Sequence, residues 1–396
     1  MKKKTLNYTI GLILANGVIA SAHAENITLY DYTEATSAYE EAYIGGNLNI
    51  TKNREDKQTA YDLNLNIDYD KVFSSSDRDT TLRVYADGNV KRDGTEDADS
   101  VDNYTAGASA TVDNYFTPNS NTGFWYGSAS IDSNSAYDDA QTKAVVGVGY
   151  GRVTNVTPMA KAIRIMDELK SRNILKAAPS KGAYQAIAQI IAKEKEYVSK
   201  YGGRDYQQYW INDMEKVLKS QNLIQGNFNA AGVLRTYHVL VNEKISTRKH
   251  GWKVRAGLGY VGQNFEGLSS KPALEVGAEY HKPLNNRTQF SNELVGTTIL
   301  NNGDNAYNIK NIMSLTHEID DRIDWENSWV MDYNANALDD DEVMNNTVTS
   351  RFAYELVNEL DFTVTGKISN TDGSNDIDNP DGTDRALLMG VRYRLK

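Results

Sequence analysis

The chain has 396 residues, a formal net charge of −11 and no cysteine. The lack of cysteine excludes a disulfide framework, a cysteine-bound metal centre and a thiol nucleophile. The mean hydropathy of −0.57 argues against a bundle of membrane-spanning helices, each of which needs about 20 apolar residues. The 25 tyrosines, against 8 phenylalanines and 5 tryptophans, favour positions where an apolar ring ends in a solvated hydroxyl.

Residues 1–24 carry the three parts of a secretory signal peptide. A basic start over residues 2–4 is followed by an apolar stretch over residues 8–20, and an Ala-His-Ala cleavage site ends the segment at residues 22–24. The segment holds three lysines and no acids, so its removal changes the net charge from −11 to −14. We expect an exported protein in which residues 25–40 form a periplasmic N-terminal segment.

From residue 41 onward, apolar and polar residues alternate with a period of two over most of the chain. Such alternation predicts strands with one apolar and one polar face. We expect barrel strands 1–6 within residues 41–154 and strands 7–14 within residues 248–396. The individual strands are predicted at 41–52, 58–71, 79–92, 102–116, 122–134, 140–154, 249–262, 271–282, 287–300, 305–319, 322–334, 346–357, 360–370 and 384–396.

Four features of these strands favour a membrane barrel over a soluble sandwich. Most of the runs last about 11 to 15 residues, whereas soluble strands usually have about 5 or 6. Aromatic residues lie near the strand ends, as membrane interfaces require, and an even strand number is typical of bacterial barrels. The connections also alternate in length. The short ones are 72–78, 117–121, 282–286, 320–321 and 358–359; the opposite ones, mostly longer, are 93–101, 135–139, 262–270, 334–345 and 371–383.

These features predict an all-β transmembrane fold, an antiparallel up-and-down outer-membrane β-barrel of about 14 strands. Short turns face the periplasm in such barrels, and long loops face outward.

Residues 155–247 interrupt the alternation with a helical period. Thr157 as N-cap and Pro158 at the first helical position predict the first helix start. Ser180 is expected to cap a second segment, which the glycines at 202–203 would end. Two further segments follow, and the last, beginning near Asn229, is rich enough in β-branched residues to form a strand instead.

Strand parity places this insertion in the periplasm, and its charge is opposite to that of the barrel. Residues 155–250 hold 16 lysines and arginines against 8 acids, a net charge of +8, which leaves −22 for the rest of the mature chain. The insertion could bind an anionic periplasmic partner, plug the acidic lumen, or be an ordinary solvated bundle.

The polar faces of the predicted strands point into the lumen and supply the candidate pore-lining residues. If the hairpin over 249–282 is symmetric about its loop, Lys253 faces Glu279 at cross-strand distance. The charges could tune what passes through a pore, or pair with one another in a closed lumen. The predicted lumen-facing charged residues are Arg83, Asp87, Lys253, Arg255, Glu275, Glu279, Glu293, Asp324, Glu326, Arg351, Glu355, Asp361, Lys367, Arg392 and Arg394.

Signals for catalysis are weak, and we expect no enzyme. The mature chain has four histidines, His238, His250, His281 and His317, and none belongs to a metal-binding or nucleophile motif. We interpret His281 and His317 as hydrogen-bonding residues of the inner rim. The net negative charge argues against nucleic acid as a partner.

One loop predicted to face outward carries five aspartates among flexible residues. Closely spaced carboxylates of this kind suit a hard cation such as Ca²⁺, although the spacing does not match an EF-hand. These candidate calcium ligands are Asp372, Asp376, Asp378, Asp381 and Asp384. We expect no other cofactor.

The C-terminus, with Gly390, Tyr393 and Leu395 at characteristic positions, resembles the assembly signal of Gram-negative outer-membrane β-barrel proteins in general, the porin-like barrels. Those proteins usually end on an aromatic residue, whereas this chain ends on Lys396. The resemblance implies an outer-membrane location, with the lipid bilayer, lipopolysaccharide and the outer-membrane assembly machinery as partners.

Two functions are compatible with these features. The first is a polar pore or export conduit for small or polymeric polar solutes, with periplasmic helices that gate it or dock a partner. The alternative is a closed barrel that acts as a structural anchor and presents the basic helical insertion to a periplasmic partner.

Overall fold

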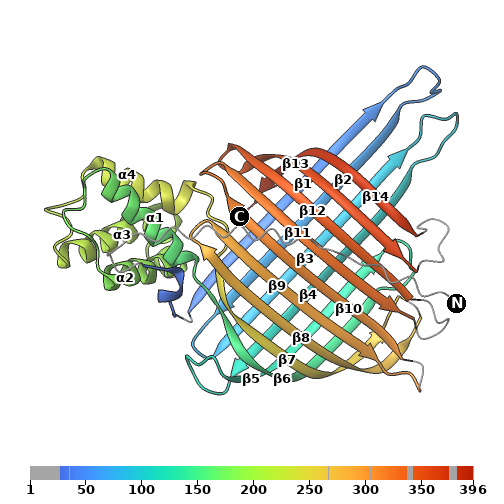
Figure 1. Cartoon of the computed structure of the whole chain (residues 1–396), viewed down its shortest axis with the longest axis horizontal. Helices are drawn as coiled ribbons and strands as arrows, with labels where there is room; N and C mark the ends of the chain where they lie inside the picture. The colour runs from blue at the N-terminus through green and yellow to red at the C-terminus, as the bar shows by residue number, and fades with distance from the viewer. Residues whose placement is uncertain are drawn as a thin grey trace, which may run out of the picture.

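The computed structural model describes residues 27–34, 36–265, 267–302, 305–336, 342–373 and 381–395. The strands form one closed antiparallel barrel in which each strand pairs with its neighbours in sequence and β14 pairs with β1 (Figure 1). The fourteen strands are β1 (Ser37–Thr51), β2 (Ala60–Ser74), β3 (Arg78–Arg92), β4 (Val101–Tyr115), β5 (Gly123–Asn134), β6 (Gln141–Asn155), β7 (Lys249–Gln263), β8 (Ser269–Asn285), β9 (Thr288–Ile299), β10 (Ala306–Glu318), β11 (Ile323–Ala335), β12 (Glu342–Val357), β13 (Leu360–Asp372) and β14 (Gly382–Arg394).

The predicted barrel is confirmed, and most strand bounds differ from the predicted ones by only a few residues. The start of the first strand is a correction. Residues 25–40 were expected to precede the barrel, but β1 begins at Ser37 because Ser37–Glu40 continue the ladder opposite Lys71–Ser74 of β2. The signal-peptide prediction for residues 1–24 lies outside the described residues.

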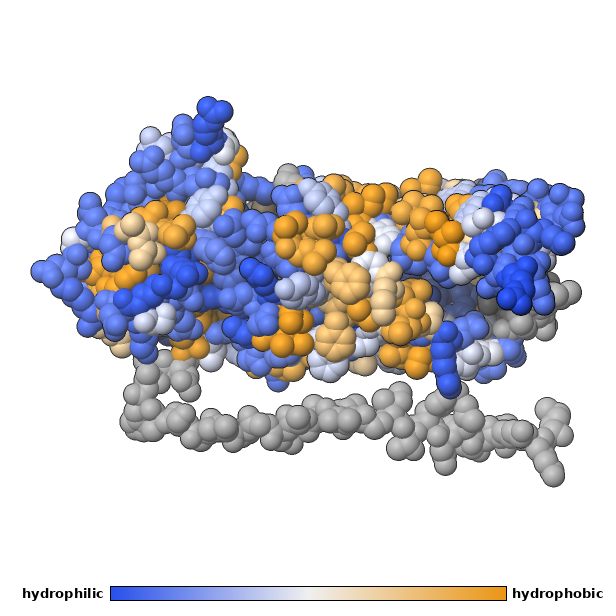
Figure 2. Space-filling model, turned by 90° about the horizontal axis from the view of Figure 1, so that it is seen from above, coloured by the Kyte–Doolittle hydropathy of each residue, from blue (hydrophilic) through white to orange (hydrophobic). Residues whose placement is uncertain are grey.

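The outside of the barrel is apolar over its middle, as Figure 2 shows on one face. Val146, Leu258 and Leu387 are among the large apolar side chains that remain exposed there. Aromatic pairs pack near one end of the strands, including Tyr150 with Trp252 and Trp325 with Phe352. A closed barrel with an apolar outer surface and interfacial aromatic residues is a transmembrane barrel of the outer-membrane type.

The helical module, defined as residues 157–242, lies at one end of the barrel, which we call the module end (Figure 1). Its core surrounds Trp210, which is fully buried and donates its indole N–H to the carbonyl of Ile190 at 2.7 Å. No helix in the described part of the chain combines the length and apolar character needed to cross a membrane. The helices are α1 (Thr157–Ser171), α2 (Lys181–Ala192), α3 (Glu194–Ser220) and α4 (Ala230–Tyr237), which continues as a π-helix, η2 (His238–Asn242).

Details of the module differ from the predicted pattern. Thr157 is the first residue of α1 rather than its cap, and its hydroxyl instead accepts a hydrogen bond from the backbone N–H of Arg248 at 2.8 Å. The second helix ends at Ala192, and Gly202 breaks α3 with a φ of +78°. The segment after Asn229 is helical, as its apolar spacing predicted, and not the strand that its β-branched residues left open; the Asn229 side chain caps it by accepting from Gly232 N–H.

The N-terminal segment ties the module to the barrel. Its short 3₁₀-helix, η1 (Leu29–Asp31), lies against the module, and Leu29 and Tyr32 are buried in the module core. Asp31 forms an ion pair with Lys181 at 2.5 Å, and the Tyr30 hydroxyl donates to the carbonyl of Pro283 in β8. The module is therefore held by this segment as well as by its two covalent connections to β6 and β7.

Candidate functional site

Charged side chains cross the lumen in the half of the barrel nearest the module. Arg83 of β3 bonds Glu293 of β9 at 2.8 Å and Asp70 of β2 at 3.2 Å. Strands β3 and β9 are six positions apart in the ring of 14, so the Arg83–Glu293 ion pair joins opposite walls. Two oppositely charged groups meeting there leave less room for a solute than the backbone ring alone would give.

Lys253 of β7 forms a second crossing. Its Nζ lies 2.9 Å from Asp113 of β4 and 3.4 Å from Glu279, its register partner in β8. The Lys253–Glu279 pairing expected from hairpin symmetry is thus present. Asp113 and Lys253 are both buried, so each charge needs the other.

A third crossing depends on a glycine. Gly151 of β6 has a φ of +100°, and an added Cβ would lie 2.3 Å from the carbonyl oxygen of Trp252. The next residue, Arg152, bonds Asp79 of β3 at 2.8 Å and also donates to backbone carbonyls of the β2–β3 turn. A side chain at Gly151 would push β6 away from β7 and displace this arginine.

Two aromatic rings of β5 lie on the lumen side of the barrel wall. Phe124 and Tyr126 of β5 are fully buried, although they lie on the polar face of the barrel. The Phe124 ring lies over Gly149, and a Cβ added to Gly149 would come within 2.2 Å of it. The Tyr126 ring lies over Gly147, and a Cβ added to Gly147 would come within 2.6 Å of it. The glycines at alternate positions of β6 therefore make space for rings that narrow the lumen.

A cavity of about 230 Å³ lies among the lumen-facing side chains of β1 to β9. Lys143 and Glu275 form an ion pair on its wall at 2.7 Å, and Arg255 and His281 also line it. Hydroxyl groups cover the facing wall, from Ser109, Thr111, Ser128 and Ser130. Such a lining offers both charges and neutral hydrogen-bonding groups to a polar solute.

A separate ion-pair network occupies the lumen side of β11 to β14. Arg392 of β14 bonds Glu326 at 2.9 Å and Asp361 at 3.0 Å, and Arg351 reaches the same Glu326 at 3.3 Å. Lys244, which comes from outside the barrel, bonds Asp361 at 2.8 Å and Asp324 at 3.2 Å. A cation from the segment after the module therefore completes the charge balance of the barrel wall.

Residues 243–248, which we call the return segment, connect the module to β7 and lie in the mouth of the barrel. Ser246 donates its backbone N–H to Glu318 of β10 at 3.0 Å, and the hydroxyl of Thr247 donates to Glu41 of β1. Strands β10 and β1 are five positions apart around the ring. Adjacent residues can contact strands that far apart only if the backbone runs across the opening.

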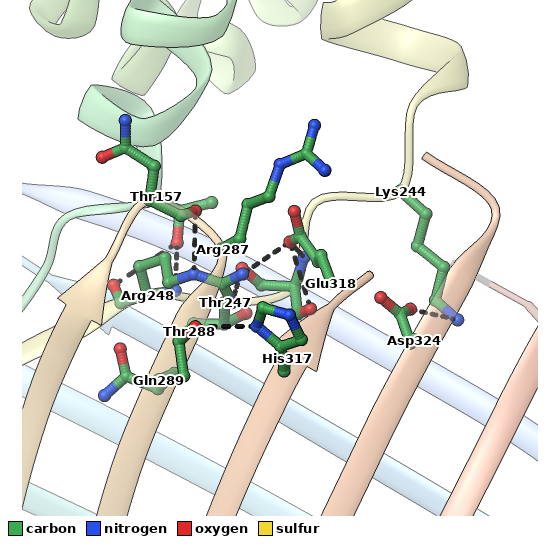
Figure 3. A network of polar contacts seen from close by, with 12 residues as sticks. Thr157, Lys244, Thr247, Arg248, Arg287, Thr288, Gln289, His317, Glu318 and Asp324 are labelled. Atoms are coloured by element: carbon green, nitrogen blue, oxygen red, sulfur yellow. Dashed lines mark hydrogen bonds and ion pairs between the residues drawn. The ribbon is translucent and has the colours of Figure 1, made fainter. Parts of the chain in front are cut away.

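Glu318 is the centre of the contacts in this mouth (Figure 3). It is 1% exposed and accepts from Arg248 and from Arg164 of α1, each at 2.6 Å. Arg164 also pairs with Glu243, and burial raises the pKa of Glu243 although Arg164 opposes the rise. One barrel carboxylate thus binds both the helical module and the return segment.

The structure places the predicted lumen residues on the expected strand faces. Arg83, Lys253, Arg255, Glu275, Glu279, Glu293, Asp324, Glu326, Arg351, Asp361 and Arg392 take part in the ion pairs above or lie beside them. Three further predicted residues lie on the same strand face as a residue of these ion pairs. Asp87 lies on the face of Arg83 in β3, and Glu355 lies on the face of Arg351 in β12. Lys367 lies on the face of Asp361 in β13. Arg394 donates to the carbonyl of Asn358 in the β12–β13 turn.

The predicted calcium loop lies partly outside the described residues, so the calcium site stays a prediction. Asp372 ends β13 and Asp384 lies near the start of β14, while Asp376 and Asp378 lie outside the described residues and Asp381 stands at the edge of that gap. The described residues contain no cluster of three or more metal-ligating side chains.

His281 and His317 each have a hydroxyl partner near the module end, and His250 contacts an aromatic ring. His281 Nδ1 lies 2.9 Å from the Ser291 hydroxyl, and His317 Nδ1 lies 2.8 Å from that of Thr288. The ring of Tyr30 meets His250 edge-on, with ring centroids 4.6 Å apart. These contacts agree with rim positions for His281 and His317.

Several residues of the site were not singled out from the sequence. Asp113 and Lys143 occupy lumen-facing positions of alternating strands, so strand parity could have found them. Lys244, Arg248 and Glu318 lie at the strand ends or in the return segment, where no period marks which way a side chain points.

Comparisons with known proteins add a partial family match and general similarity to barrels. Residues 243–356 are similar to a family described as "Protein of unknown function, DUF481". The matched range includes the return segment and runs through β7 to most of β12. No curated protein matches the chain's sequence.

Among solved structures, the chain is similar to the outer membrane protein Omp33 of Acinetobacter baumannii, with 8% identity over 91% of this chain and 98% of that one, and a TM-score of 0.28. It is also similar to OprB of Pseudomonas putida, with 9% identity over 91% of this chain and 93% of that one, and a TM-score of 0.31. The translocator domain of the autotransporter NalP from Neisseria meningitidis gives 7% identity over 92% and 89%, and a TM-score of 0.27. Scores this low do not indicate what the chain does.

Proposed function

We propose that this protein is an outer-membrane pore for small polar solutes, which the return segment and the helical module close at the periplasmic end. The observation that carries the proposal is the path of residues 243–248 across the barrel mouth. Lys244 bonds β11 and β13, Ser246 bonds β10, and Thr247 bonds β1. A segment needed only as a linker would have no reason to bind four strands from within the opening.

The bonds of the return segment are suited to a closure that can be released. They are side-chain hydrogen bonds and ion pairs, and a change in the position of α1 would act directly on Arg164 and Glu318. Ion pairs of this kind have two discrete arrangements, paired and solvated, so the module can shift the closure between two states.

The lumen also supports a preference for solute charge. The half of the lumen away from the module carries more acids than cations on its polar face. The acids are Asp62, Asp68, Asp87, Asp132, Glu275, Asp332 and Asp384, and the cations are Lys91, Lys143, Lys271, Lys310 and Lys367. An acidic vestibule raises the local concentration of cations. The proposed solutes are therefore neutral or positively charged, and small enough to pass the Arg83–Glu293 crossing.

The test is single-channel recording of the full-length protein in planar bilayers. Lys244→Met removes the cation that binds β11 and β13 but keeps most of the side-chain volume, so it should raise the open probability well above that of the wild type. Lys216→Met, at an exposed position on α3, is the matched control and should leave gating unchanged. Silence in both variants and in the wild type would refute the pore and leave the closed anchor.

The second candidate, an anchor that presents the module to an anionic partner, is supported by the exposed cations of the module. Lys193 and Arg204 are exposed, and neither forms an ion pair within the described residues. Lys193→Glu with Arg204→Glu should abolish capture of an acidic periplasmic polymer by the intact protein. Unchanged capture would argue against the anchor.

A further inference from the structure

The seam that closes the barrel, between β1 and β14, is much shorter than any other. Only four residue pairs join these strands, from Tyr43–Arg394 to Gly46–Val391. Every other neighbouring pair of strands is joined through 10 to 15 residue pairs. Beyond Gly46, residues 47–51 pair with β2 alone, and residues 382–390 pair with β13 alone.

The unpaired halves of both strands lie within the apolar outer surface. Leu48 and Ile50 of β1 and Leu387 and Met389 of β14 point outward and are 57 to 70% exposed. A backbone N–H or C=O without a partner costs several kcal/mol in hydrocarbon, and for this reason open sheet edges are absent from lipid-exposed regions. These two edges therefore need a hydrogen-bonding partner, which a lipid chain cannot provide.

Glycines mark the point where the seam stops. An added Cβ on Gly390 would lie 2.6 Å from the carbonyl oxygen of Gly46, so β14 lies close against β1 at this position. On the module side, β14 is fixed by the backbone bond from Leu395 N–H to Ala42 at 2.8 Å, and the Tyr393 hydroxyl donates to Glu359. Of the three residues predicted as an assembly signal, Tyr393 pairs with Ile44 in the seam, Leu395 bonds to Ala42, and Gly390 directly precedes the first paired residue of β14.

A cavity of about 100 Å³ lies at this point of the barrel wall. It is lined by lumen-facing groups, including Asn47 and Asn66, and by outward-facing Met389 and Val391. A strand that entered here would meet polar side chains on one face and apolar side chains on the other.

We propose that the free edges of β1 and β14 form a binding site for an extended polypeptide strand supplied by another protein. The incoming strand continues the existing four-pair ladder and bonds to β1 over residues 47–51. It carries alternating residues, apolar beside Leu48 and Ile50 and polar beside Asn47 and Asn49. This is β-strand addition, in which backbone bonds give affinity and alternate side chains give specificity. The inference does not depend on whether the barrel conducts.

The probe is a synthetic peptide with the sequence of residues 382–391, which in the continued register places Met389 beside Leu48 and Leu387 beside Ile50. Its binding to the full-length protein in lipid nanodiscs is compared with that of a scrambled peptide and of a version with proline at two donor positions. A sealed variant carries Ile50→Cys and Leu387→Cys, which would face each other if the ladder continued; the chain has no other cysteine. Its folding is checked by heat-dependent mobility on gels.

The expected result is binding to the wild type, with at least tenfold weaker binding of both control peptides and of the native peptide to the sealed variant. Hydrogen exchange of the backbone amides tests the same seam in the wild-type protein, without any substitution. Amides in 47–51 and 382–390 should exchange at least tenfold faster than those of the paired half, and the peptide should slow them.

The proposal would be overturned if the amides of residues 47–51 and 382–390 exchanged as slowly as those of the paired half and no peptide bound. The β1–β14 ladder would then be complete. Equal binding of the scrambled peptide would also overturn it, because the edge would then not select the side-chain pattern of the strand.

Discussion

Glu318 provides the sharpest prediction, because one carboxylate holds both the module and the return segment. Glu318→Gln keeps the shape of the side chain and removes its charge, leaving the guanidinium groups of Arg164 and Arg248 without it. Arg248 is 0% exposed, and Glu318 is its one ion-pair partner within the described residues. Breaking a buried ion pair by removing one partner costs about 3–5 kcal/mol.

We take the lower end of that range because the glutamine oxygen can still accept one hydrogen bond. About 3 kcal/mol corresponds to roughly a 100-fold change in an equilibrium constant. In the proposed pore, this change applies to the equilibrium between the closed and the open state. The ratio of open to closed time in single-channel recordings should therefore rise roughly 100-fold. Limited proteolysis should also cut the return segment much faster.

The matched control is Glu168→Gln on the surface of α1. Glu168 forms an exposed ion pair with Arg172 at 3.3 Å, and such pairs contribute about 0–1 kcal/mol. Both variants should keep the heat-dependent gel mobility of a folded barrel. If Glu318→Gln changes gating no more than Glu168→Gln does, the mouth contacts do not hold the closure.

Three further predictions follow from the lumen and the module. Arg83→Gln removes the crossing to Glu293 and should raise open-channel conductance, with a small stability cost of about 0–1 kcal/mol because the pair is partly solvated. Trp210→Ala should destabilise the module by about 3–5 kcal/mol in chemical denaturation, while the barrel stays folded. Burial raises the pKa of Glu243, so its contribution to stability is full below about pH 4.3 and is lost as the pH rises through the raised value. Glu243→Gln should remove this slope from the melting temperature of the module measured between pH 3.5 and 7.

Alternation was sufficient to predict the barrel, because every strand has one face toward lipid and one toward the polar lumen. The same parity predicted the inward direction of Arg83, Lys253 and Glu293, and hairpin symmetry predicted the Lys253–Glu279 pairing. Local sequence also marked the insertion, since its apolar residues change to a helical period.

Contacts across the barrel could not be predicted in the same way. Whether Arg83 meets Glu293 depends on the closure of the ring, which brings strands about 200 residues apart to opposite walls. The return segment has no period, so nothing in its sequence shows that Lys244 enters the lumen. The short seam is also invisible in the alternation, because both β1 and β14 alternate normally beyond the point where their pairing stops.

The most direct test of the account is a recording in which the closure is locked and then released in the same bilayer. Glu41→Cys and Thr247→Cys place two thiols at a contact between β1 and the return segment, in a chain with no other cysteine. With the thiols joined by a reducible bifunctional reagent, we expect a silent barrel that begins to conduct when reductant is added. Steady conductance while the link is intact, or silence after its reduction, would contradict the claim that residues 243–248 close a pore.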